Sequence, residues 1–228
     1  MAARTIAIGD IHGCASALAT LIEAIKPTSG DTIVPLGDYV DRGPDSRGVL
    51  DLMLQLQQQC QLMPLLGNHE LMMMAALESM ENLRVWLHCG GAATVQSYGG
   101  DLEQIPAKHL EFLRNCRPFF ETDQHLFFHA NYDPRLPPEE QPDRLLFWEH
   151  LVLYENGMHT IPARHFSGKV AFVGHSPQEN GEILDLDDVV CIDTHCVGKG
   201  CLTALDVNSR TAWQADKHGT LLSETAGP

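Results

Sequence analysis

Residues 5–14 read TIAIGDIHGC and place two potential metal ligands, Asp10 and His12, directly after a short apolar run. Such a run, bounded by a turn signal, is typical of a buried strand. Gly9 and Gly13 flank the two polar residues, and Gly-Asp is ordinary turn chemistry. The stretch therefore indicates either a simple turn or a pair of metal ligands at a strand end, and the rest of the chain must decide.

The first third of the chain alternates strand-like and helix-like segments. Strands are predicted at 4–9, 31–37 and 61–67, and helices at 14–26, 44–59 and 69–80. Leu18, Leu21, Ile22 and Ile25 fall on one face of the first helix, and Pro44 suits the first turn of the second. Strands that alternate with helices predict a parallel sheet with right-handed crossovers.

The remainder of the chain is helical first and strand-rich later. Helical spacing occurs at 81–100 and 106–116, and a strand is predicted at 125–130. Residues 131–168 are rich in proline and charge and predict an excursion of loop and helix. Short strands with plausible hairpins are predicted at 169–174, 182–186, 189–193, 201–207 and 211–215. Because no repeat or flexible linker interrupts this pattern, we expect one domain over residues 1–228.

Composition narrows the class of protein and its surroundings. The 228 residues are 44% hydrophobic and carry a formal net charge of −15, which argues against nucleic acid or an anionic membrane as a partner. No apolar stretch approaches the ~20 residues that span a bilayer, and the motif at residues 9–13 leaves no room for a signal peptide. Seven cysteines without a CxxC pair favour a reducing compartment, so we expect a cytoplasmic protein.

Polar side chains follow five of the predicted strands. They are Asp10 and His12; Asp38, Asp41 and Arg42; Asn68, His69 and Glu70; His129; and His175. Ligand sites of α/β sheets gather at the carboxyl ends of strands, so these residues are expected to converge. A lone histidine after a strand is usually a turn or core residue. Agreement among five strand ends is harder to explain by accident.

The residue types indicate which metals suit such a site. Carboxylate, imidazole and amide ligands fit manganese, iron or zinc. One carboxylate can bridge two cations about 3.5–4 Å apart, which together clamp a phosphate and the attacking oxygen. Cys191, Cys196 and Cys201 match no zinc spacing, and we expect them to be small buried apolar residues.

The motifs GDIHG, GDYVDRG and GNHE, followed by histidines in FFHA and VGHS, resemble those of the PPP family of metal-dependent serine/threonine phosphatases. These phosphatases belong to the calcineurin-like metallophosphoesterases. The resemblance runs from residue 9 to about residue 205, and WLHCGGAATVQSYG is similar to the compact bacterial and phage-type members. It implies an α/β fold, the calcineurin-like metallophosphoesterase fold, in which two packed mixed β-sheets are flanked by helices.

The resemblance implies a dinuclear centre with two divalent metal ions, manganese in the first place and iron or zinc as alternatives. By motif position, the ligands of the first ion are Asp10, His12 and Asp38, and those of the second are Asp38, Asn68, His129 and His175. Asp38 would bridge the two ions. A bridging hydroxide would then attack phosphorus directly, without a phosphoenzyme.

The resemblance also implies the residues that handle the substrate. Arg42 would grip the phosphate, since a guanidinium matches phosphate oxygens bidentately. His69, paired with Asp41, would be the general acid for the leaving alkoxide. Glu70 would support the site without binding metal.

Two positions depart from the usual family pattern. Many small members carry a second phosphate-binding arginine two residues after a tryptophan, whereas here Trp148 is followed at that distance by His150. His150 would replace that arginine when protonated or would simply face solvent, and Arg144 or Arg164 could compensate. Relatives commonly have glycine at the position of His195, which either lines the rim of the site or packs at a strand end.

These observations predict a hydrolase of phosphoserine or phosphothreonine esters, with phosphotyrosine also possible, acting on a phosphorylated protein or a small phosphoester. The alternative is a symmetrical diadenosine tetraphosphate hydrolase, whose family typically shows GNHD and lacks the aspartate that precedes Arg42. Asp41 and Glu70 favour the phosphatase. A third alternative is a non-catalytic, metal-stabilised binding module, which would have lost ligands or His69. The oligomeric state cannot be read from the sequence.

Overall fold

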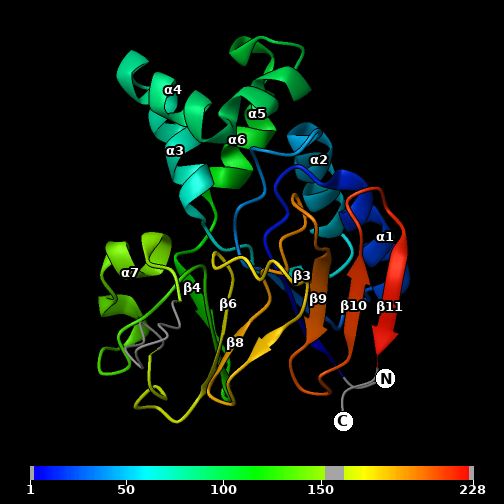
Figure 1. The fold of residues 1–228 in the computed structure, drawn as a ribbon, viewed down its shortest axis with the longest axis vertical. Helices are drawn as coiled ribbons and strands as arrows, with labels where there is room; N and C mark the ends of the chain where they lie inside the picture. The colour runs from blue at the N-terminus through cyan, green and yellow to red at the C-terminus, as the bar shows by residue number, and fades with distance from the viewer. Residues whose placement is uncertain (1–2, 152–161, 226–228) are drawn as a thin grey trace.

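Two mixed β-sheets face each other at the centre of the computed structural model, which describes residues 3–151 and 162–225 (Figure 1). The first sheet has six strands in the order β11-β10-β9-β1-β2-β3. Their bounds are β1 Thr5–Ile8, β2 Thr32–Pro35, β3 Gln61–Leu62, β9 Leu202–Asp206, β10 Ala212–Ala215 and β11 Leu221–Thr225. The expected α/β architecture of two mixed sheets flanked by helices is confirmed.

The first sheet is parallel on one side of β1 and antiparallel on the other. Thr5 pairs with Thr32 and Ile33 with Leu62, both in parallel register, whereas Ala7 pairs with Leu205 in an antiparallel ladder. The predicted βαβαβ start is therefore confirmed. Strand β3 is shorter than the predicted 61–67, although the backbone N–H groups of Met63 and Leu65 still donate to the carbonyls of Ile33 and Pro35 beyond its end.

The second sheet has five strands in the order β4-β5-β6-β8-β7. Its strands are β4 Phe119–Glu121, β5 His125–Phe128, β6 Val170–Val173, β7 Leu184–Asp185 and β8 Val189–Cys191. Strands β5, β6 and β8 run parallel, and β4 and β7 are antiparallel edge strands. Edge strands β4 and β11 were not predicted, since neither shows a clear alternation of buried and exposed residues.

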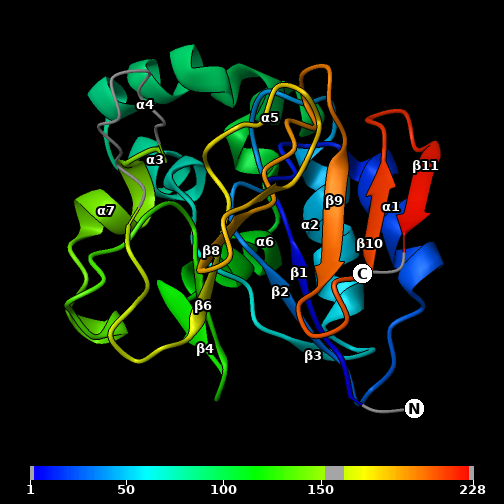
Figure 2. The same ribbon diagram turned by 60° about the horizontal axis from the view of Figure 1, so that its bottom comes forward.

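Helices cover the outer faces of both sheets and cap one end of the molecule (Figures 1 and 2). The helices are α1 Ala15–Ile25, α2 Ser46–Leu56, α3 Asn68–Ala76, α4 Met80–Trp86, α5 Ala92–Ser97, α6 Ala107–Arg114 and α7 Asp143–Trp148. Three short turns of other helix types are η1 Leu87–Gly91, η2 Leu102–Gln104 and η3 Pro138–Glu140. No helix in the described ranges is both long and apolar enough to cross a membrane.

The predicted helix over 81–100 is broken at Gly90. Its φ of 117° is a left-handed value that glycine adopts without strain, and this kink lies inside η1, between α4 and α5. A Cβ at this position would also come within 2.8 Å of the Arg42 side chain. The Gly90 carbonyl accepts the backbone N–H of Arg42 at 3.1 Å, so the kink helps to place that arginine.

Period-two alternation sends neighbouring residues of each strand into different cores. Ala7 and Phe127 pack between the two sheets, whereas Ile6 packs against the helices beside the first sheet. Phe128 belongs to a third cluster on the outer side of the second sheet, together with Leu146 of α7. Both sheets are therefore buried on two faces, which explains their continuous apolar strands.

The predicted excursion over 131–168 is confirmed where the structure describes it. It contains η3 and α7, separated by short loops. Residues 152–161 lie outside the described residues. Helix α7 ends at Trp148. Trp148 and His150 both line the cavity described below.

Candidate metal centre

The structure brings the predicted site residues together at the carboxyl ends of the parallel strands. Asp10 and His12 follow β1, and Asp38 follows β2. His129 follows β5 and His175 lies two residues beyond β6. Asn68 and His69 open α3, so the site combines loops from both sheets with the first turn of a helix.

Five of these residues have left-handed backbone conformations. The φ values are 45° at His12, 52° at Asp38, 73° at Asp41, 67° at Arg42 and 60° at His175. Residues other than glycine rarely adopt such values, and they cluster at functional sites where the surrounding structure enforces them. The tight turns direct consecutive side chains toward one point.

Asp38 is the shared centre of two groups of candidate metal ligands. One group joins it with His12 and His69, and the other joins it with His129 and His175. Its Oδ2 lies 3.4 Å from His12 Nε2, and its Oδ1 lies 3.5 Å from His129 Nε2. Asp38 therefore has the position required of a bridging ligand.

The histidine rings are oriented so that their free nitrogens face the centre. His12 Nδ1 donates to the Val40 carbonyl at 3.0 Å, and His129 Nδ1 donates to the Leu36 carbonyl at 2.8 Å. A carbonyl can only accept, so each neutral ring directs the Nε2 lone pair inward. His175 Nε2 is buried without a partner among the described residues. These donors fit a divalent cation.

Burial keeps two of these imidazoles neutral. It lowers the pKa of His12 to about 3 and the pKa of His175 to about 3. Only the neutral ring can offer a lone pair to a cation. The protonation state at neutral pH is therefore the one that metal binding requires.

Three carboxylates are buried close together in the same place. The Asp10 carboxylate accepts the backbone N–H of His175, with both oxygens at 3.1 Å. Burial, with Asp193 and Asp38 nearby, raises the pKa of Asp10 well above its usual range. Burial, with Asp38 nearby, raises the pKa of Asp193 to about 7. Bound cations would relieve this repulsion between like charges.

A cavity of about 220 Å³ opens onto these groups. Its lining residues are Asp10, Asp38, Arg42, Asn68, Trp148, His150, His175, Pro177 and Asp193. Asp193 was missed from the sequence, although it follows the apolar run VVCI as the other site residues follow their strands.

His69 forms a buried pair with Asp41. His69 Nδ1 lies 2.7 Å from Asp41 Oδ2, and the same carboxylate accepts Trp86 Nε1 at 2.8 Å and the Thr94 hydroxyl at 2.7 Å. Burial would lower the pKa of His69, but Asp38 and the hydrogen bond with Asp41 outweigh it and raise that pKa. His69 is therefore able to hold a proton close to Asp38. No local pattern linked Trp86 or Thr94 to this role.

Glu70 supports the loop that carries Asp38. Its carboxylate accepts the backbone N–H groups of Asp38 and Tyr39, both at 2.8 Å, and of Gly67 at 2.9 Å. These bonds use the oxygens of Glu70 within the protein, as expected of a supporting residue. A Cβ on Gly67 would collide with the Asp38 carboxylate, so this position requires glycine.

Arg42 lies at the border of the candidate centre. Its Nη1 is 3.0 Å from His12 Nε2, and its side chain lines the cavity. No carboxylate of the described residues lies within 4.0 Å of it, so no ion pair holds the guanidinium. The group is placed to meet an anion in the cavity.

The structure brings His150 to the cavity. The His150 ring stacks on the His175 ring, with centroids 4.3 Å apart and planes 17° apart. The two arginines that could compensate for the missing phosphate-binding arginine each have a carboxylate neighbour. Arg144 lies 2.9 Å from Glu149. Arg164 lies 3.3 Å from Asp188.

His195 does not line this cavity. Its φ is 60° and its Nδ1 is buried without a partner within 3–151 and 162–225. Its backbone N–H donates to Asp193 Oδ1 at 3.1 Å. His195 is therefore linked to the centre by this backbone bond to Asp193.

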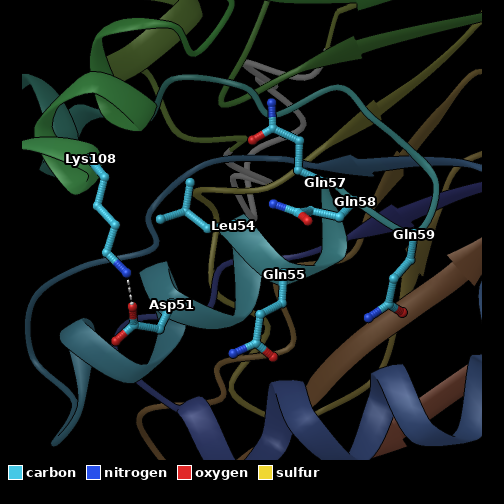
Figure 3. A pocket seen from close by; sticks show the side chains of 7 residues that line it. All are labelled: Asp51, Leu54, Gln55, Gln57, Gln58, Gln59 and Lys108. Carbon is cyan, nitrogen blue, oxygen red and sulfur yellow. Dashed lines mark hydrogen bonds and ion pairs between the residues drawn. The ribbon is translucent and has the colours of Figure 1, made fainter.

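Larger hollows than this cavity lie elsewhere on the described residues. The hollow of about 560 Å³ in Figure 3 lies at the end of α2 and is lined by Asp51, Leu54, four glutamines and Lys108. None of the candidate metal ligands faces it, and Lys108 donates to Asp51 at 2.7 Å. Its size alone does not make it the reactive site, because the converging carboxylates and imidazoles lie elsewhere.

Comparison with known sequences identifies a family over most of the chain. Residues 3–204 match the sequence model of the calcineurin-like phosphoesterases. Serine/threonine-protein phosphatase 1 of Salmonella typhimurium is 30% identical over 206 residues, covering 86% of this chain and 88% of the relative. The symmetrical bis(5'-nucleosyl)-tetraphosphatase of Acidovorax sp. is 44% identical over 70 residues, covering 30% of this chain and 24% of the relative.

Solved structures share the fold over nearly the whole chain. One provisionally described as a diadenosine tetraphosphatase has a TM-score of 0.70 at 20% identity, covering 100% of this chain and 95% of that chain. A cold-active protein-tyrosine phosphatase of Shewanella has a TM-score of 0.65 at 20% identity, covering 99% and 81% respectively. At this level of identity the likeness concerns the fold alone.

Proposed function

The chain belongs to the calcineurin-like phosphoesterases, and from that premise we propose that it is a metal-dependent phosphatase of phosphoserine and phosphothreonine esters. The family makes it a phosphoester hydrolase with a dinuclear metal site. The observation that carries the finer proposal is the buried His69–Asp41 pair beside Asp38. The relative that matches most of the chain is a serine/threonine phosphatase, which supports the same substrate class.

We assign the metal ligands as two sets that share Asp38. Asp10 and His12 complete the first set, and the second is completed by Asn68, His129 and His175. When bound there, two divalent cations supply charge neutralisation of the phosphate and an activated water for direct attack on phosphorus. Manganese is our first choice among the metals that suit this donor set.

The protein side chains orient the ester and complete the reaction. Arg42 would turn from His12 to the phosphate and bind two of its oxygens. His69 would donate the proton that the departing oxygen needs, and Asp41 would keep its ring in position. His150 would approach the phosphate from its place in the cavity wall beside His175.

A symmetrical dinucleoside tetraphosphatase is the second candidate. Its support is the 44% identity of a 70-residue segment with the enzyme of Acidovorax. Asp41, which is fully buried and bonded to His69, favours the phosphatase. A non-catalytic binding module has the least support, because every assigned ligand and His69 is present. The single domain over 1–228 and the cytoplasmic location stay predictions.

A substrate panel tests the proposal. The manganese-loaded protein is assayed with a phosphoserine peptide, a phosphotyrosine peptide, para-nitrophenyl phosphate and diadenosine tetraphosphate. We expect the phosphoserine peptide to be hydrolysed with the highest kcat/KM. A clear preference for diadenosine tetraphosphate would replace the first candidate by the second.

Two variants separate metal binding from proton donation in the same panel. Asp38→Ala should lose bound metal and all turnover, because both ligand sets contain this carboxylate. His69→Asn should keep its metal while kcat falls by about 10²–10⁴-fold, the range for a lost general acid. Metal analysis of both purified variants checks the division, and equal metal loss in both would contradict it.

A further inference from the structure

Arg42 separates the metal cavity from a second hollow of about 450 Å³ and lines both. The wall of this hollow comes from segments that are far apart in the chain. Pro44 precedes α2, Ala93 lies in α5, Val197 lies in the loop between β8 and β9, and Lys217 lies in the turn between β10 and β11. The volume falls in the range of small-ligand sites, and its apolar wall has a few polar groups.

The charges of this second hollow differ from those of the chain as a whole. The chain has 30 acidic and 15 lysine and arginine residues, yet none of the described residues that line the hollow is acidic, and the lining includes Arg42 and Lys217 together with His218. Lys217 Nζ donates to the Gly198 carbonyl at 3.0 Å and has no carboxylate of the described residues within 4.0 Å. In the hollow of Figure 3, by contrast, Lys108 is neutralised by Asp51.

Because Arg42 lines both the metal cavity and the second hollow, one substrate could occupy both. A phosphate that Arg42 held in the metal cavity would have the second hollow on the other side of the same side chain. Among the described residues, the hollow has no phenylalanine, tyrosine or tryptophan on which a nucleobase would stack, and the imidazole of His218 is its one aromatic ring. Small and aliphatic groups such as Pro44 and Val197 suit the methylene carbons of an amino-acid side chain.

We propose that this hollow binds an acidic side chain next to the phosphorylated residue of a peptide substrate, and that Lys217 recognises its carboxylate. This inference rests on the proposed phosphatase function and adds a sequence preference to it. Lys217 acts on binding of the flanking residue and takes no part in the bond that breaks. Its loss therefore changes KM for acidic peptides and leaves small phosphoesters unaffected.

Two phosphoserine peptides test the proposal with the manganese-loaded, full-length protein. They differ only in having glutamate or glutamine on both sides of the phosphoserine, and para-nitrophenyl phosphate serves as the reference. We expect the wild type to favour the glutamate peptide in kcat/KM by about threefold to fivefold, the range of one exposed ion pair. Lys217→Met should abolish this preference, Lys217→Arg should keep it, and 0.5 M salt should reduce it.

Lys26→Met is the matched control. It removes the same charge just beyond the far end of α1, about 18 Å along the helix axis from Cys14 at the hollow. The control should leave the preference intact, and all variants should hydrolyse para-nitrophenyl phosphate at the wild-type rate.

Several results would overturn the assignment. One is an equal rate for both peptides in the wild type, and another is an unchanged preference in Lys217→Met. If Lys217→Met lowered kcat/KM only for diadenosine tetraphosphate, the hollow would be assigned to a nucleotide instead. If the protein hydrolyses para-nitrophenyl phosphate but neither peptide, the proposed phosphatase function itself is wrong. The inference about Lys217 then fails as well.

Discussion

At the scale of single residues, the candidate site depends on how each imidazole is held. His12 and His129 are oriented by backbone carbonyls, and burial lowers the pKa of each. His69 is held by a carboxylate instead, and its pKa is raised. The same residue type is thus prepared to bind a cation in one place and to carry a proton in another.

The raised pKa of His69 predicts a pH dependence. A general acid works only while protonated, so kcat should fall as the pH rises through the pKa of His69. Asp41→Asn removes one of the groups that raise this pKa, and the alkaline limb should move to lower pH. The measurement is kcat of manganese-loaded protein between pH 5 and 9, with Asp51→Asn as the remote control. An unmoved alkaline limb would show that another group supplies the proton.

His150 offers a test of phosphate binding. Its ring lines the cavity and stacks on His175. A guanidinium stays charged at every relevant pH and offers paired planar donors that an imidazole lacks. His150→Arg should therefore lower KM for para-nitrophenyl phosphate at pH 8 by about threefold to tenfold. Steady-state kinetics measure it, and an unchanged KM would indicate that His150 does not approach the phosphate.

At the scale of elements, close approach between loops and glycines positions the ligands. Gly67 caps α3 in an extended conformation, with φ −101°, directly against Asp38. Glu70 in the first turn of α3 then binds the backbone of the Asp38 loop. The helix start and the loop after β2 are therefore built as one unit.

Gly67→Ala should weaken metal binding. The new Cβ would displace the Asp38 carboxylate, and we expect metal affinity to fall about tenfold to a hundredfold, as for lost support of a ligand. Isothermal titration with manganese measures it. Gly30→Ala is the control, since a Cβ there meets only Thr28 Oγ1 at 3.9 Å. Equal affinities for the two variants would rule out this close contact.

At the scale of the whole molecule, the metal centre joins the two sheets. Asp38 comes from the first sheet, whereas His129 and His175 come from the second. The apolar cluster between the sheets, which includes Ala7, Phe127 and others, lies under the same strands. Any ligand that binds both sets of side chains therefore stabilises the packing of one sheet on the other.

Manganese should raise the thermal stability. With metal at about 100 times its Kd, the free energy of unfolding rises by about 2.7 kcal/mol, which corresponds to about 5–10 °C in Tm for a chain of this size. Differential scanning calorimetry with and without a chelator measures the shift. Asp38→Ala should show none of it. A shift of equal size in that variant would mean that the stabilising ions bind elsewhere.

The sequence by itself determined the residues with metal-binding chemistry and the strands that precede them. Asp10, His12 and His175 lie within a few residues of short apolar runs. Turn chemistry and period-two burial act over such short spans, so local sequence is enough to predict them.

Tertiary structure alone decided which strand ends are neighbours and what surrounds each ligand. The packing of the second sheet on the first brings Asp193, after β8, close to Asp10, after β1. The path from α4 to α5 brings Trp86 and Thr94 to Asp41. The hollow at Lys217 exists only because the β10–β11 turn meets the loop of Arg42. These contacts join residues far apart in the chain, and their positions follow from the packing of whole sheets and helices, which no local pattern records.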